Sequence, residues 1–318
     1  MSTKDVILST LEHSSTYISG EELGRKLGVS RAMINKAINE LRSEGYEISS
    51  STKKGYILNK KVDKLSEPII RNHITCGYDV RLVNNTTSTN NDLKKMMLET
   101  KNDKLCIVAR EQTEGKGRMN RSYYSAEGGI YLSILFKPNF TNDIALKITC
   151  AAAVGVCRAI EKNSSLEPKI KWINDIYLNS KKCCGILTQA MTNFETSQIE
   201  SVIVGIGLNY NIANFPDELK DTATDIIRND ENVNSINSFA SSIINEVVNA
   251  IDNITDKAIM AEYKNKSCVI GKDINVISLK ETKRATVLDI DGNGELVVRY
   301  ESGEVDKIFS GEISIREV

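Results

Sequence analysis

The stretch Ser19-Gly-Glu-Glu-Leu-Gly-Arg-Lys-Leu-Gly-Val-Ser-Arg-Ala-Met-Ile-Asn-Lys-Ala-Ile38 decides the fold of the first segment. Ser19 and Glu22 have the spacing of a capping box, which marks the start of a helix. Gly28 ends that helix, and apolar residues recur on one face of the helix that follows. Two helices joined by a glycine-containing turn predict a helix-turn-helix, about Gly20 to Asn39.

The residues after this turn predict a two-stranded wing. Gly45–Ile48 and Gly55–Leu58 read as strands around a short loop and complete a winged helix-turn-helix over residues 1–62. Polar and cationic side chains lie where contacts to bases and phosphates would arise: Ser30, Arg31, Asn35, Lys36, Lys53 and Lys54. The segment is only slightly basic, so a solvated face of a packing domain remains the alternative to DNA binding.

The composition of the 318-residue chain is typical of a soluble globular protein with two or three domains: the net charge is -1 and 26% of the residues are charged. No apolar run approaches the ~20 residues of a membrane span, and charges interrupt the N-terminal residues, so we expect no membrane segment and no signal peptide. Seven cysteines without a CxxC spacing indicate reduced thiols in the cytoplasm. The only histidines, His13 and His73, argue against histidine-dependent catalysis.

The middle segment, residues 67–268, mixes strand-like and helix-like runs, and its polar clusters follow predicted strands. Ser88–Asn90 come after one strand, and Leu105–Gln112 is a buried strand that leads into the loop Gly115-Lys-Gly-Arg-Met-Asn-Arg121. Glycines that alternate with cations can present backbone N–H groups and positive charge to phosphate. The loop matches neither the Walker nor the G-x-G-x-x-G pattern, and a flexible surface loop is the alternative.

Further motifs stand at Lys171-Trp-Ile-Asn-Asp175, Lys182–Leu187 and Gly205-Ile-Gly-Leu-Asn209. Polar clusters at several strand ends predict one converging pocket, and the cationic loop makes nucleotide chemistry the favoured interpretation. Residues 269–318 alternate strands with hairpin turns at Ile290–Leu296 and Glu301–Gly303, which predicts a small SH3-like barrel.

With these motifs, the chain resembles the bifunctional biotin–protein ligases that are also biotin-operon repressors. The resemblance covers essentially the whole length in the same domain order. The family's usual loop is G-R-G-R-x-G-R and its usual strand motif is K-W-P-N-D, so Lys116, Asn120 and Ile173 are departures, as is Tyr123 where tryptophan is common. The resemblance implies an α+β protein with a winged helix-turn-helix (1–62), a mixed-sheet α/β ligase core of the class II synthetase type (67–268) and an SH3-like barrel (269–318).

The resemblance also implies a two-step reaction with ATP, Mg²⁺ and biotin: formation of biotinyl-5′-AMP, then transfer to a carrier-protein lysine. It implies catalytic roles for Lys182, Arg118 and Asp175, and contact of Mg²⁺ with Asp175 and Asn209. The biotin- and ATP-binding residues that it implies are Ser88, Thr89, Asn90, Gln112, Gly115, Lys116, Gly117, Arg118, Tyr123, Lys182, Gly185 and Asn209.

The partners that the resemblance implies are the biotin carboxyl-carrier domain of acetyl-CoA or pyruvate carboxylase, operator DNA, and a second copy of the chain when the adenylate is bound. We expect a cytoplasmic protein without membrane contact. Three alternatives stay open at this point: a monofunctional ligase with a vestigial head, a lipoate or octanoate ligase, and a non-catalytic biotin-sensing repressor.

Overall fold

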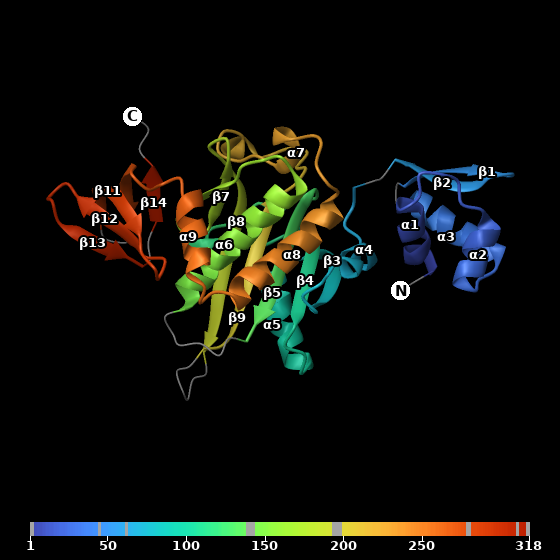
Figure 1. The fold of residues 1–318 in the computed structure, drawn as a ribbon, viewed down its shortest axis with the longest axis horizontal. Coiled ribbons are helices and arrows are strands. Elements are labelled where there is room, and N and C mark those ends of the chain that lie inside the picture. The colour runs from blue at the N-terminus through green and yellow to red at the C-terminus, as the bar shows by residue number, and fades with distance from the viewer. Residues whose placement is uncertain are drawn as a thin grey trace. The chain divides into compact units, whose positions relative to one another are not determined.

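The computed structural model describes residues 3–43, 46–60, 63–137, 144–192, 199–277, 281–309 and 312–315. The chain divides into two compact units, residues 1–73 and 74–318, which Figure 1 shows in ribbon form. The division falls after His73, so residues 67–73, which the sequence analysis places at the start of the middle segment, belong to the first unit. The reason is that the side chain of Ile69 packs into the hydrophobic core of that unit.

The first unit consists of α1 (Thr3–Glu12), α2 (Gly20–Leu27), α3 (Arg31–Ser43), the hairpin strands β1 (Glu47–Ser51) and β2 (Gly55–Lys60), and α4 (Glu67–Asn72). Ser19 Oγ accepts a hydrogen bond from the Glu22 N–H at 3.0 Å, and Gly28 ends α2 with φ 65°. Gly55 lies at φ 101°, where a Cβ would lie only 2.1 Å from the Ile18 carbonyl oxygen. The predicted winged helix-turn-helix is confirmed.

The second unit is built on a sheet that has seven strands among the described residues. Its order is β3 (Asp79–Thr86), β4 (Leu105–Gln112), β5 (Gly129–Phe136), β9 (Ile199–Asn209), β8 (Lys181–Thr192), β7 (Asp175–Leu178) and β6 (Lys169–Lys171). Strands β3 and β4 are parallel, and the other neighbouring pairs are antiparallel. The predicted mixed sheet is confirmed.

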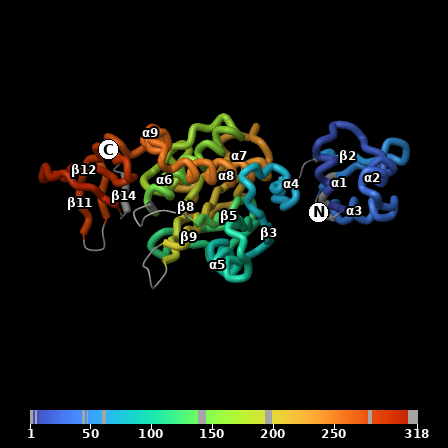
Figure 2. Tube along the Cα trace, turned by 60° about the horizontal axis from the view of Figure 1, so that its bottom comes forward, coloured from blue at the N-terminus to red at the C-terminus, as the bar shows by residue number. Residues whose placement is uncertain are grey.

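Helices cover both faces of this sheet, as Figure 2 shows: α6 (Ile144–Asn163) and α8 (Ile236–Asp252) lie on one side, and α5 (Thr89–Glu99) on the other. Leu93 of α5 packs against Leu135 of β5 and Ile203 of β9. Because side chains alternate along a strand, Ser133 of β5 and Gly205 of β9 face the same side as α5. Shorter elements follow β9, namely the 3₁₀ turn η2 (Asp217–Leu219), α7 (Ile226–Asn229) and α9 (Lys257–Lys266).

The C-terminal part of the second unit is an antiparallel sheet in the order β13 (Val305–Ile308), β12 (Leu296–Tyr300), β11 (Thr282–Ile290), β10 (Asp273–Ile277) and β14 (Glu312–Ile315). This arrangement agrees with the predicted SH3-like fold. The indole N–H of Trp172 donates to the carbonyl of Gly294 at 2.9 Å, which joins the turn before β12 to the segment between β6 and β7 of the seven-stranded sheet. In the part of the chain that the structure describes, no helix is long and apolar enough to span a bilayer.

Candidate active site

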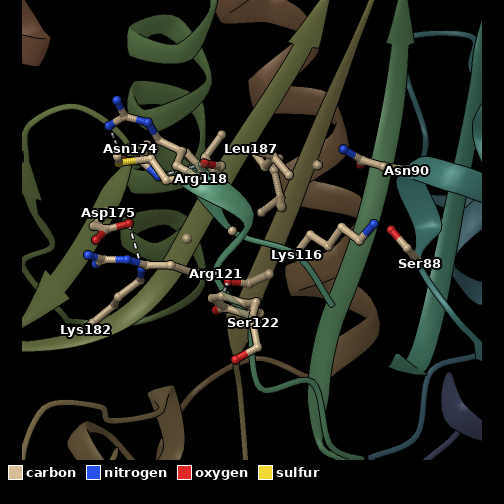
Figure 3. Close-up of a pocket in the computed structure, with 18 of the residues that line it drawn as sticks. Ser88, Asn90, Lys116, Arg118, Arg121, Ser122, Asn174, Asp175, Lys182 and Leu187 are labelled. Carbon is tan, nitrogen blue, oxygen red and sulfur yellow. Dashed lines mark hydrogen bonds and ion pairs between the residues drawn. The ribbon is translucent and has the colours of Figure 1, made fainter. Parts of the chain in front are cut away.

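A cavity of about 190 Å³ opens where the motif residues of the second unit converge (Figure 3). Among the described residues, five cations and one carboxylate line it: Lys116, Arg118, Arg121, Lys171, Lys182 and Asp175. Such an excess of positive charge in a concave site favours a polyanionic ligand such as a nucleoside triphosphate.

All of the implied ligase residues line this cavity except two, Gly115 and Asn209. Those that line it are Ser88, Thr89, Asn90, Gln112, Lys116, Gly117, Arg118, Tyr123, Asp175, Lys182 and Gly185. They come from the turn between β3 and α5, the start of α5, the end of β4, the loop that follows it, and strands β7 and β8.

Gly115 is buried at the base of the loop, where its carbonyl accepts a hydrogen bond from the Tyr123 N–H at 2.8 Å. A Cβ at this position would lie 2.4 Å from the Tyr123 carbonyl oxygen and 2.5 Å from Ser125 Oγ. Gly115 therefore shapes the loop by close packing, and the structure does not bring it into the cavity lining.

Asn209 is also buried outside the lining, and its side-chain amide donates to the Thr224 carbonyl at 3.0 Å. The backbone of Lys182 pairs with the same segment, since its N–H donates to the Thr222 carbonyl and its carbonyl accepts from the Thr224 N–H. Asn209 therefore anchors the segment that holds the backbone of Lys182, and its contact with metal or phosphate stays a prediction.

Neutral polar groups form one end of the cavity. The backbone N–H and the hydroxyl of Thr89 both donate to Gln112 Oε1, at 2.9 and 3.1 Å. Ser88 and Asn90 lie at this end, and Lys116 lies between them and the charged residues of the other end (Figure 3). Fixed neutral donors and acceptors of this kind suit an uncharged ligand group that both donates and accepts hydrogen bonds.

The charged end is organised around Lys182 and Asp175, whose Nζ and Oδ1 atoms lie 2.7 Å apart. The two residues lie on β8 and β7, which are paired in the sheet. The Lys182 ammonium also lies 5.7 Å from the centre of the Tyr123 ring, a distance at which cation–π attraction applies. Both charges thus sit on rigid strands at the cavity wall.

Arg118 reaches the same end from the loop, where Nη1 donates to Asn174 Oδ1 at 3.3 Å. Asn174 is in turn bonded to Ile186 of β8 through its side-chain amide and its backbone carbonyl. Asn174 is not among the ligands predicted from the sequence, although its place in the Lys171–Asp175 motif could have indicated it. Asn120 has φ 59°, a left-handed conformation that asparagine tolerates.

The ring of Tyr123 lies against Gly185 and Gly207, which are paired across β8 and β9. A Cβ would lie 2.9 Å from a ring carbon of Tyr123 if it were added at Gly185, and 2.4 Å if it were added at Gly207. The Tyr123 hydroxyl donates to the Gly207 carbonyl at 2.6 Å, and burial raises the pKa of this phenol well above its ordinary value. Gly185 and Gly207 thus make the floor on which Tyr123 packs, a role that their motifs alone do not disclose.

The described residues contain no group of three or more histidine, cysteine, aspartate or glutamate side chains able to hold a metal ion. Asp175 is the one carboxylate among the described lining residues. Mg²⁺ is commonly held by one or two carboxylates together with substrate phosphates and water, so a single carboxylate is compatible with Mg²⁺ that arrives with ATP.

In the first unit, the cationic side chains expected to contact DNA are exposed: Arg31 and Lys36 on α3, and Lys53 and Lys54 in the turn of the wing. Ser30 Oγ accepts from the Met33 N–H and caps α3, while Asn35 accepts a hydrogen bond from the Tyr56 hydroxyl. The hydrogen bond between Tyr56 and Asn35 joins the wing to the second helix of the helix-turn-helix.

Comparison with known proteins identifies relatives of each part. Residues 3–57 match the family described as HTH domain, residues 82–209 the Biotin/lipoate A/B protein ligase family, and residues 269–316 the Biotin protein ligase C terminal domain. The chain is similar to Bifunctional ligase/repressor BirA of Bacillus subtilis, with 33% identity over 98% of each chain, and to that of Escherichia coli, with 26% identity over 97% of this chain and 96% of the relative. A solved structure of the biotin protein ligase of Aquifex aeolicus in complex with biotin and ATP has a TM-score of 0.66 and 24% identity, covering 76% of this chain and 99% of that one.

Proposed function

Because the chain belongs to the family of bifunctional biotin ligase/repressors, we propose that it attaches biotin to a carrier-protein lysine with ATP and represses transcription when loaded with the adenylate. The observation that carries the ligase proposal is the division of one cavity into a neutral end at Thr89 and Gln112 and a cationic end around Lys182. Biotin has a neutral ureido ring at one end and a carboxylate at the other, and the two ends of the cavity match this polarity.

In the first step, a carboxylate oxygen of biotin attacks the α-phosphorus of ATP. The bond from that phosphorus to the bridging oxygen breaks, and pyrophosphate leaves. Attack by an anion on a polyanion is assisted chiefly by fixed positive charge, which Lys182, Arg118 and Lys116 supply from the cavity wall. This step has no need of a histidine base.

In the second step, a carrier lysine attacks the acyl carbon of the mixed anhydride. An amide bond forms, the bond from carbon to the phosphate oxygen breaks, and AMP leaves. Asp175 is the lining carboxylate available to orient the incoming amine and to accept its proton. Mg²⁺ bound with the nucleotide would neutralise phosphate charge, and Asp175 is the residue that we propose to hold it.

We also propose that the winged helix-turn-helix binds operator DNA and that the adenylate-loaded chain does so as a dimer. The exposed cations of α3 and the wing support DNA binding. A biotin carboxyl-carrier domain of acetyl-CoA or pyruvate carboxylase is the proposed protein substrate. The proposed location is the cytoplasm, where ATP, carboxylases and operator DNA are found.

The test of the ligase proposal is incubation of the full chain with ATP, Mg²⁺, biotin and a biotin carboxyl-carrier domain. We expect biotin-dependent pyrophosphate release and a mass increase on one carrier lysine. Replacement of biotin by lipoate or octanoate, with a lipoyl domain as acceptor, tests the related ligase chemistry. Modification of the lipoyl domain with no reaction of biotin would overturn the proposal.

A further inference from the structure

Ser133 is a polar residue in the middle of an apolar strand, with Leu132 and Ile134 on either side. Its exposed fraction is 0%, and it lies outside the cavity lining. A hydroxyl buried at such a position is unfavourable unless it is hydrogen-bonded. The bonds that Ser133 makes therefore indicate why a serine occupies the strand.

The Ser133 hydroxyl bonds two of the neutral side chains that line the cavity, Thr89 and Asn90. Its Oγ lies 2.8 Å from Thr89 Oγ1 and 2.5 Å from Asn90 Oδ1, and its one hydrogen is shared between these acceptors. Gly205, the partner of Ser133 on β9, leaves room for this contact, since a Cβ there would lie 2.3 Å from Asn90 Oδ1. The other end of the Asn90 amide donates to Gln189 Oε1 at 3.0 Å.

The same line of hydrogen bonds continues to the loop. Thr89 donates to Gln112 Oε1, and Gln112 Nε2 donates to Ser125 Oγ at 3.0 Å. Ser125 Oγ in turn donates to the carbonyl of Tyr123 at 3.0 Å. A continuous chain of hydrogen bonds thus joins the centre of β5 to the segment that ends the Gly115–Arg121 loop.

We propose that Ser133 is a positioning residue, which holds Thr89 and Asn90 for the ureido ring of biotin and, through Gln112 and Ser125, holds the base of the loop. The ligand part of this inference rests on the proposed function. A ureido ring presents two N–H donors and one carbonyl acceptor, so its binding depends on the orientation of the side chains that face it. Without the Ser133 hydroxyl, the side chains of Thr89 and Asn90 lose a shared fixed partner.

The binding test measures biotin affinity of the full chain by titration calorimetry, for the wild type and for Ser133→Ala, Ser133→Thr and Ser201→Ala. Ser201 is a matched control, because it is another buried serine in the same sheet, on β9. We expect Ser133→Ala to weaken biotin binding by about tenfold, since a buried hydrogen bond is lost. Ser133→Thr keeps the hydroxyl and should recover most of the affinity, and Ser201→Ala should bind as the wild type does.

Steady-state kinetics add a readout that general loosening would not produce: Ser133→Ala should raise KM for biotin by a larger factor than KM for ATP. Wild-type biotin affinity in Ser133→Ala would overturn the proposal. An equal loss in Ser201→Ala would do the same, because the effect would then be one of stability, which thermal unfolding of each variant measures directly.

The loop test needs no ligand. Trypsin can cleave the loop after Lys116, Arg118 and Arg121, and mass spectrometry identifies these cuts. We expect Ser133→Ala and Ser125→Ala to be cleaved there several-fold faster than the wild type and Ser201→Ala. Equal cleavage of all four proteins would overturn the coupling to the loop. A wild type that binds no biotin would contradict the proposed function instead, and the cleavage rates would still decide the positioning role.

Discussion

Lys182 and Asp175 form an ion pair between neighbouring strands, with Nζ 2.7 Å from Oδ1. The pair places the cation that we propose for adenylate formation beside the carboxylate that we propose for acyl transfer. One ion pair thus gives the cavity a group for each of the two proposed steps.

Lys182→Ala should lower the rate of biotin-dependent pyrophosphate release by 10²- to 10³-fold, roughly the effect of removing one preorganised charge-stabilising donor, about 3–4 kcal/mol. Lys181→Ala is the matched control, because the neighbouring lysine lies outside the cavity lining and donates to the Lys220 carbonyl at 3.0 Å. Release within a few-fold of the wild-type rate in Lys182→Ala would show that the role assigned to this lysine is wrong.

The Arg118→Gly variant should still form the adenylate at a reduced rate, but it should release the adenylate faster than the wild type does. The contact of Arg118 with Asn174 ties the loop to the cavity wall, and its removal should let biotinyl-5′-AMP escape and label lysines of bystander proteins. A chase that follows dissociation of the preformed adenylate is the measurement. Asn174→Ala should release the adenylate at a rate between those of the wild type and Arg118→Gly. An unchanged rate of adenylate dissociation in Arg118→Gly would contradict the proposed role of Arg118 in retaining it.

Gly207→Ala should weaken the binding of biotin, measured by titration calorimetry. The added Cβ would lie 2.4 Å from the Tyr123 ring and displace the ring. Truncation of that ring should relieve the clash, so the double variant Gly207→Ala/Tyr123→Ala should differ little from Tyr123→Ala alone. Gly292→Ala, which meets open space, serves as the control in the same calorimetric titration. Strictly additive effects of the two substitutions would rule out the packing argument.

The double variant Arg31→Ala/Lys36→Ala should weaken operator binding without changing ligase activity. Cationic contacts to phosphate release counterions. The magnitude of the slope of log K against log salt concentration should therefore fall by about 1 for each contact removed. Mobility-shift titrations with biotin and ATP at several salt concentrations measure this slope. Lys257→Ala, which removes an exposed charge from α9, is the control, and the same loss of binding in that variant would argue against a specific role of α3.

The elements of the first unit could be predicted because their signals are local. The Ser19 hydroxyl and the Glu22 N–H are three residues apart, and Gly28 and Gly55 mark left-handed backbone at the ends of elements. Such contacts join near neighbours in the chain, so residue types and spacing suffice to recognise them. The strand motifs of the second unit were recognisable in the same way, as were the residues at the ends of those strands.

The sequence by itself thus determined the order of the domains, the loop with its alternating glycines and cations, and half of the described residues that line the cavity. Only the tertiary structure decided which of them meet: Lys182 with Asp175, Arg118 with Asn174, and Tyr123 with Gly207. It also showed that Asn209 bonds the segment that supports Lys182, and it disclosed Ser133. The physical reason is that Arg118–Asn174 and Tyr123–Gly207 join segments far apart in the chain. Strand pairing across the sheet sets which side chains touch, and this holds also for Lys182 and Asp175 on neighbouring strands.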